Sequence, residues 1–353
     1  MVTSTRTGAS KTRGTMRNTP PEEYVLVREE AEFEFIAECL RRAGAGNEDA
    51  ETTSRLVTNC DLRSVRSHGI NRAFGYCQAL RDGRLNPDPQ VLRAIETPTS
   101  VVMDGDGGLG YLPMKQGTEA AINKARAGGI GLAIARHIGH YGSAGHYTRM
   151  CAEQGLIGFS VQGGRTSGRQ PSSQDGEKPS VAFTGAPAMS FGMPGRQGDP
   201  IILDMVSHAL SEYRGEEFSD LPGRVPGAFF KSVGLVATSA LLGGGLAGVS
   251  LPAADDIQDK WEQARLGGTV VAIDPQSVGV PREELEDEVD RYAAHIKQSY
   301  APLPGFDEVM LPGEKEARSE ADYRANGIRF GPREQEAAQE MSDLLGVALP
   351  WRA

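Results

Sequence analysis

Cysteine is scarce in this sequence of 353 residues, because there are only four and no two of them form a CxxC pair. Small secreted domains stapled by disulfides are rich in cysteine, and structural zinc sites place cysteines in close pairs. The sequence therefore predicts reduced thiols, a cytoplasmic location and no cysteine-based metal site. The four residues are Cys39, Cys60, Cys77 and Cys151.

Positive charge is also in short supply. Lysine and arginine number 37 against 47 aspartates and glutamates, which leaves a formal net charge of −10. Nucleic acids and membrane surfaces are polyanionic and select basic proteins. We therefore expect neither nucleic acid nor membrane as a partner, and we expect a small-molecule carboxylate as the substrate.

Long apolar runs are missing as well. A membrane-spanning helix needs about eighteen or more consecutive apolar residues, and the nearest stretch, residues 233–251, is half glycine, alanine and serine. Residues 1–22 are polar and lack the apolar segment of a secretory signal. We expect a soluble protein with a disordered tail over residues 1–22.

Apolar periodicity predicts a mixed α/β fold. Chains beyond about 250–300 residues usually form more than one domain, so two interleaved domains are expected. Helical spacing begins the chain, with Asn47 as a candidate helix cap, and strands then alternate with helices. The predicted helices are 29–42, 47–62, 71–81, 114–127, 143–154, 232–248, 283–299 and 332–345; the predicted strands are 91–95, 100–103, 130–135, 156–161, 200–205 and 269–274; residues 163–179 form a polar loop or lid.

Three of the six histidines lie close together, at His137, His140 and His146, between a predicted strand and a predicted helix. Helix starts attract anions and imidazole titrates near neutral pH, so the segment could hold a cofactor and an acid/base group. A glycine-rich turn with solvent-facing histidines is an equally good interpretation of the spacing. A metal site is disfavoured, because Gly139 and Gly142 oppose a helix there and no HExxH motif is present.

A second constellation follows the predicted helix 47–62. His68, Arg72 and Tyr76 are spaced by four residues and would share one face of a helix. Arginine grips a carboxylate through two parallel N–H bonds and histidine transfers protons near neutral pH, which suits an anionic substrate whose carbonyl gains or loses a proton. Taken alone, the pattern is more simply an exposed polar helix end.

Residues 105–110 read GDGGLG but lack the strand–turn–helix spacing of a dinucleotide fingerprint, which argues against a Rossmann fold. Together the segments resemble the malate/L-lactate dehydrogenase family, whose nicotinamide-binding domain is not a Rossmann fold. The resemblance covers most of residues 25–330. It is carried by DLR and SHGINR within residues 61–72 with Tyr76, GRLNP at 83–87, DGDGGLG at 104–110, HYGSAGHY at 140–147 and GLIG at 155–158.

The resemblance implies a non-Rossmann α/β (α+β mixed) fold and a homodimer. It implies a helical catalytic and dimerisation domain from residues 23–112 and 300–353, and a nicotinamide-binding-like domain over 113–299. The expected activity is an NAD(P)H-dependent reduction, or the reverse oxidation, at the C=O or C=N of a small 2-oxo, 2-hydroxy or cyclic imino acid. NAD and NADP are both open as the cofactor.

The resemblance also assigns residue roles. His68 matches the family's proton donor, supported by Ser67 and Asp204, while Arg72 and Tyr76 match the substrate-binding positions. His140 matches a histidine near the nicotinamide that acts as acid/base in some members. The implied cofactor-binding residues are His140, Tyr141, Gly142, Thr184, Gly185, Pro187 and Lys231.

Two segments depart from the family pattern. Its Gly-Thr-Asn-Pro appears here as Thr184-Gly185-Ala186-Pro187, without the asparagine amide, and the stretch between Asp204 and Lys231 is shorter than usual. A rival hypothesis therefore keeps the acid/base residues but replaces redox chemistry by elimination, tautomerisation or cyclisation. A non-catalytic scaffold is a third hypothesis.

Overall fold

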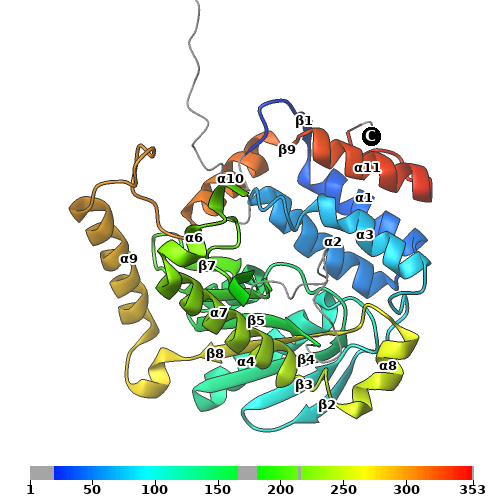
Figure 1. The fold of residues 1–353 in the computed structure, drawn as a ribbon, viewed down its shortest axis with the longest axis horizontal. Coiled ribbons are helices and arrows are strands. Elements are labelled where there is room, and N and C mark those ends of the chain that lie inside the picture. The colour runs from blue at the N-terminus through cyan, green and yellow to red at the C-terminus, as the bar shows by residue number, and fades with distance from the viewer. Residues whose placement is uncertain (1–19, 166–180, 184, 214–215, 352–353) are drawn as a thin grey trace, which may run out of the picture.

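The computed structural model describes residues 20–165, 181–183, 185–213 and 216–351. Figure 1 shows a cluster of helices from both ends of the chain lying against a part built on one large sheet. This mixed architecture confirms the predicted fold class. Most of the predicted tail at residues 1–22 and most of the predicted loop at 163–179 lie outside the described residues.

The helical cluster forms where the sequence predicts it. Helices α1 (Glu29–Arg42), α2 (Asn47–Leu62) and α3 (Ile70–Arg81) pack together and against the carboxyl-terminal helices α10 (Glu314–Asn326) and α11 (Pro332–Leu345). The capping role expected of Asn47 is wrong, because Gly46 is the cap and Asn47 is the first helical residue. Strands β1 (Val25–Val27) and β9 (Ile328–Phe330) pair antiparallel and join the two ends of the chain.

The sheet has seven strands in the order β2-β3-β4-β8-β5-β6-β7. The pair β3 and β4 is parallel and every other neighbouring pair is antiparallel, so β3, β4, β5 and β7 run in one direction. Their carboxyl ends therefore meet at one edge of the sheet. The strands are β2 (Leu92–Glu96), β3 (Ser100–Asp104), β4 (Ile130–Ile138), β5 (Ile157–Gly164), β6 (Ala188–Met193), β7 (Ile201–Val206) and β8 (Leu266–Ile273).

Helices cover both faces of this sheet. Alternate residues of β4 point to opposite sides, so Ala133 and Ala135 pack into the core beneath α4 (Tyr111–Gly128) and α5 (Gly145–Ala152). Ile134 packs on the other side, against Ala247 and Val249. The buried alanines let α4 approach the sheet closely. The division into two domains, with a boundary between residues 112 and 113, stays a prediction. Strands β2 and β3 lie before that boundary and yet belong to the sheet.

The helix predicted at 232–248 differs most from the structure. It begins earlier, as α7 (Pro226–Ala240), and widens into a π-helical turn at Leu241–Gly245. Residues Pro226–Gly245 are long and apolar enough to cross a membrane by composition, a test that core helices of soluble proteins also pass. In this fold α7 packs against β5. The remaining helices are α6 (Leu221–Arg224), α8 (Asp255–Lys260) and α9 (Arg282–Ser299), and α9 projects at the left of Figure 1.

Candidate active site

The turn between α2 and α3 holds His68 in place. Asp61, in the last turn of α2, accepts the backbone N–H of Ile70 at 2.5 Å, and this bond ties the start of α3 to the end of α2. Gly69 faces the same carboxylate so closely that a Cβ there would lie 1.9 Å from Asp61 Oδ1. Only glycine fits, and the turn presents His68 at the amino end of α3.

A second buried carboxyl group, that of Glu32 in α1, contacts the carboxyl group of Asp61. Both oxygens of Glu32 are buried without an N–H or O–H donor from another described residue, and the group that hydrogen-bonds to it is the carboxyl of Asp61. Two carboxyl groups can share such a bond only if one is protonated. Burial raises the pKa of Glu32 well above its usual range and that of Asp61 to about 7, so we assign the shared proton to Glu32, which leaves Asp61 as the acceptor for the Ile70 N–H.

The structure brings the two predicted histidines together. The rings of His68 and His140 are stacked with centroids 5.5 Å apart, although one follows α2 and the other follows β4. Ser67 Oγ lies 2.9 Å from Nδ1 of His68. Tyr76, one turn along α3 from Arg72, places its hydroxyl 2.7 Å from Nδ1 of His140. Four of the predicted catalytic and substrate-binding side chains thus form one cluster.

The protonation state of His140 follows from its partners. The backbone N–H of Gly142 can only donate, and it does so to Nδ1 of His140 at 3.2 Å. That nitrogen is therefore unprotonated, Tyr76 also donates to it, and Nε2 carries the ring proton. Tyr111 extends the chain, with its hydroxyl 3.1 Å from that of Tyr76. The buried hydroxyls fix one tautomer of His140.

Both rings are neutral at pH 7. Burial, together with the positive charge of Arg72, lowers the pKa of His68 to about 4. Burial, His68 and Arg72 lower the pKa of His140 to about 3. Arg72 is exposed, and its guanidinium forms no hydrogen bond or ion pair with another described residue. An unpaired arginine beside two neutral imidazoles suits a carboxylate ligand.

Asp204 lies on β7 and takes different partners from those expected. Its carboxylate accepts a short hydrogen bond from Ser143 Oγ and another from the backbone N–H of Gly145, and burial raises its pKa. Within the described part of the chain, the hydrogen-bond partner of the His68 ring is Ser67. The supporting role of Asp204 toward His68 therefore stays a prediction.

A cavity of about 400 Å³ opens beside Asp204, within the range typical of small-molecule sites. Its walls come from the end of α2, the start of α5, β7 and the segment 301–316 that leads into α10. His146 and Cys60 meet at this wall, with Nε2 and Sγ 3.3 Å apart. Burial lowers the pKa of His146 and raises that of Cys60, so both groups are neutral.

The three clustered histidines do not share a ligand. His137 contacts the carboxylate of Asp104 at 3.0 Å, while His140 contacts Tyr76 and His146 contacts Cys60. Over residues 20–165 and the other described ranges, no group of three or more His, Cys, Asp or Glu side chains is arranged to hold a metal ion. Each of the three histidine rings therefore has a different side-chain partner.

The expected cofactor-binding residues converge on one edge of the sheet. His140, Tyr141 and Gly142 follow β4, while Gly185 and Pro187 precede β6, whose start lies beside the ends of β5 and β7. Gly142 has a φ of +85°, and a Cβ there would lie 2.4 Å from the Tyr111 ring. Thr184 lies outside the described residues.

Two polar groups at this edge fit a polar ligand. Gln162 Nε2 and Ser207 Oγ are buried and have no hydrogen-bond partner among the described residues, and Ser207 donates its backbone N–H to Pro187. Lys231 is exposed on α7, which packs next to β5. Buried donors and a nearby cation suit the carboxamide and phosphates of a dinucleotide.

Sequence reasoning missed several residues of this site. Glu32 and Tyr111 lie in helices whose apolar spacing hides a buried polar group, so only the fold shows what they face. Ser143 carried a signal, because it stands in the segment HYGSAGHY that was already singled out. Gln162 lies near the end of β5 and Ser207 directly follows β7, at an edge that the topology alone defines.

The mixed, non-Rossmann sheet carries at its edge two neutral histidines and an arginine that is unpaired among the described residues, a set that suits acid/base chemistry on a small carboxylate. Comparison with known proteins identifies the family. The sequence profile described as malate/L-lactate dehydrogenase matches residues 27–214 and 216–337. The chain belongs to the malate/L-lactate dehydrogenase family, which confirms the resemblance and the expectation of an NAD(P)-dependent dehydrogenase or reductase.

Individual relatives match over nearly the whole chain. L-sulfolactate dehydrogenase of Methanocaldococcus jannaschii is 27% identical over 353 residues, covering 92% of this chain and 98% of its own. (2R)-3-sulfolactate dehydrogenase (NADP(+)) of Chromohalobacter salexigens is 26% identical, covering 81% and 89%. The structure of malate dehydrogenase from Pyrococcus horikoshii superposes with a TM-score of 0.78 at 26% identity, covering 94% and 98%.

Proposed function

We propose that this protein is a cytoplasmic dehydrogenase that interconverts a small 2-hydroxy acid and its 2-oxo acid with NAD or NADP, and that His68 moves the proton. The observation that carries the proposal is the stacked pair of His68 and His140 beside the unpaired guanidinium of Arg72. The relatives named for malate and sulfolactate support this substrate class.

The chain's own residues divide the work of the reaction. Arg72 binds the substrate carboxylate next to the reacting carbon. Ser67 Oγ lies 2.9 Å from Nδ1 of His68. We assign the ring proton of His68 to this Nδ1, which leaves an unprotonated Nε2 for the substrate hydroxyl. His140 offers its Nε2–H, held in that tautomer by Gly142 and Tyr76. The nicotinamide, when bound, would accept the hydride from carbon 2 of the hydroxy acid or supply it to carbon 2 of the oxo acid.

Because the pKa of His68 is low, the free enzyme is in the protonation state needed for oxidation of the substrate. A neutral imidazole is ready to accept a proton, so oxidation of a hydroxy acid needs no prior titration. For reduction, His68 must first take up a proton. A bound carboxylate offsets the charge of Arg72, which otherwise lowers the pKa of His68, and so favours that uptake.

The cofactor is proposed to lie along the sheet edge formed by Gly142, Gly185 and Pro187. Gln162 and Ser207 supply buried donors without partners, and Lys231 supplies charge. The expected side-chain set thus keeps polar groups for a dinucleotide even though Ala186 replaces an asparagine. Either dinucleotide fits this description.

Substitution of His68 tests the proposal. His68→Ala should lower kcat by about 10² to 10⁴, the usual contribution of a positioned acid or base, while the dissociation constants of NADH and NADPH stay unchanged. His140→Ala is the matched comparison, because it removes the stacked ring but leaves the proposed base. Turnover by His68→Ala equal to that of the unaltered enzyme would refute the assignment.

A further inference from the structure

Arg149 is a partly buried cation that has no hydrogen-bond or ion-pair partner among the described residues. It lies on α5 and lines the 400 Å³ cavity together with Ser143 and Asp204. The residue is only partly exposed, and burial lowers the pKa of its guanidinium. Through the described ranges no carboxylate or carbonyl approaches it within hydrogen-bonding or ion-pairing distance. Glu153, Glu316 and Glu320 act on its charge only through space.

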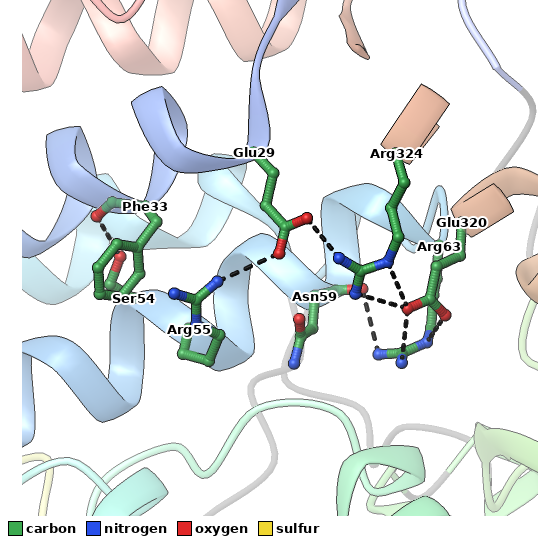
Figure 2. A network of polar contacts seen from close by, with 8 residues as sticks. All are labelled: Glu29, Phe33, Ser54, Arg55, Asn59, Arg63, Glu320 and Arg324. Atoms are coloured by element: carbon green, nitrogen blue, oxygen red, sulfur yellow. Dashed lines mark hydrogen bonds and ion pairs between the residues drawn. The ribbon is translucent and has the colours of Figure 1, made fainter. Parts of the chain in front are cut away.

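The neighbouring Arg63, in the same wall, is a cation with an ion-pair partner. Figure 2 shows Arg63 surrounded by acceptors: its Nε lies 2.9 Å from Glu320, and its terminal nitrogens reach Glu320 and the Asn59 carbonyl at 3.2 and 3.4 Å. Glu320 also pairs with Arg324. Arg149 has no such arrangement, although it faces the same cavity.

Among the described residues, none of the other charged groups that line the cavity forms an ion pair with Arg149. Glu308, which also lines the cavity, is paired with Arg318. Glu316 is a carboxylate on the same wall. Burial raises the pKa of Asp204, which weakens its negative charge. An uncompensated guanidinium in a partly desolvated position costs free energy that a bound anion would recover.

One stretch of the lining is mainly apolar. It is formed by the segment 301–313, which contributes Pro302, Leu303, Phe306, Met310 and Leu311. The cavity therefore pairs one charged anchor with a hydrocarbon surface, and its volume accommodates an acid group on a small organic body.

We propose that Arg149 anchors an oxyanion site in this cavity, which binds a carboxylate, sulfonate or phosphate group of a small ligand. Two ligands can bring such a group: a substrate with a second acid group, or the dinucleotide through a phosphate. The attribution to either ligand rests on the proposed function, whereas the oxyanion site itself does not.

The first test uses inorganic sulfate and measures binding rather than turnover. The unaltered protein should bind sulfate saturably in calorimetric titration at constant ionic strength. Arg149→Met should weaken that binding roughly tenfold to hundredfold, the equivalent of a lost hydrogen bond to a charged group. Arg149→Lys should give an intermediate affinity, because it keeps the charge but loses the planar fork. Arg291→Met is the control, since Arg291 is an exposed cation on α9 outside the cavity.

A second measurement guards against a folding defect. Without sulfate, Arg149→Met should have a Tm equal to or above that of the unaltered protein, because the substitution removes an unpaired charge. A large fall in Tm would show that Arg149 is a structural ion-pair partner and would overturn the proposal. So would equal sulfate affinity in both proteins, or the absence of saturable binding by the unaltered one.

The source of the oxyanion is read from two further titrations. If the substrate supplies it, Arg149→Met should raise KM for malate more than for lactate, which lacks the second acid group. If the dinucleotide supplies it, the same variant should instead weaken NADH or NADPH binding and treat both acids alike. Sulfate binding that depends on Arg149 in a protein without dehydrogenase activity would keep the oxyanion site and reject only the proposed function.

Discussion

The imidazole rings of His68 and His140 lie 5.5 Å apart and are inclined by 22° to one another. They come from opposite parts of the fold, one from the turn after α2 and the other from the end of β4, so their proximity depends on the docking of the helical cluster against the sheet. Each ring has a different set of partners. Ser67 contacts His68, whereas Tyr76 and Gly142 contact His140. The two rings therefore differ in the atom that each offers to a substrate.

The pH dependence of catalysis should reveal the low pKa of His68. Because burial and Arg72 lower that pKa to about 4, kcat/KM for oxidation should be level around pH 7 and fall tenfold per pH unit below about 4. Arg72→Met removes a positive charge, so the pKa of His68 should rise and the fall in kcat/KM should begin at a higher pH. An acidic limb near pH 6.5 in the unaltered enzyme would show that His68 titrates as an ordinary exposed histidine.

Arg72 should distinguish carboxylate substrates from neutral ones. Arg72→Lys keeps the charge but loses the bidentate fork, so kcat/KM for carboxylate substrates should fall roughly tenfold to hundredfold, or about 1.5 to 3 kcal/mol. Dinucleotide affinity should not change. Steady-state kinetics with a 2-hydroxy acid and its amide check this, and an amide that reacts as well as the acid would place Arg72 outside the substrate site.

Glu32 should support the His68 turn through its proton. Glu32→Gln keeps a donor toward Asp61, whereas Glu32→Leu leaves Asp61 without it. The leucine variant should therefore lose about 1.5 to 3 kcal/mol of unfolding free energy and lose kcat as well, while the glutamine variant keeps both. Denaturant unfolding and kcat for the two variants provide the measurement, and equal behaviour of the pair would exclude a shared proton.

The same pair predicts a pH effect with a definite sign. The folded-state pKa of Glu32 is raised, so its contribution to stability is complete below the unfolded-state value near 4.5 and is lost as pH rises through the folded-state value. Glu32→Gln cannot titrate and should lack this loss. Relative to the unaltered protein, it should gain stability as pH rises. A constant difference in unfolding free energy from pH 5 to 9 would contradict the assignment.

The sequence predicts the local parts of this site better than their assembly. The turn around His68 and the position of Arg72 follow from spacing within one segment, and α1, α3 and α11 lie where apolar periodicity puts them. The partners of Asp204 could not be predicted, because they depend on how β7 and α5 meet in space. The strand β6 and the helix α10 were missed, because glycine and methionine in the first and many charges in the second obscure the usual patterns.

The cofactor half is harder to infer for a related reason. Its side chains come from the ends of β4, β5 and β7 and from the start of β6, and only the strand order brings them to one edge. A comparison of this segment with the family motif shows only that Ala186 replaces an asparagine. The fold shows that Gln162 and Ser207, which no motif marks, place unpartnered donors at the same edge.

Transfer of deuterium tests the central claim most directly. The protein is incubated with NADH or NADPH deuterated at the transferable position of the nicotinamide, together with a 2-oxo acid, and the hydroxy acid product is analysed by mass spectrometry. We expect deuterium at carbon 2 of the product, and product formation that falls by about 10² to 10⁴ in His68→Ala. A product without deuterium from the cofactor, or substrate conversion without any dinucleotide, would contradict the account and favour non-redox acid/base chemistry.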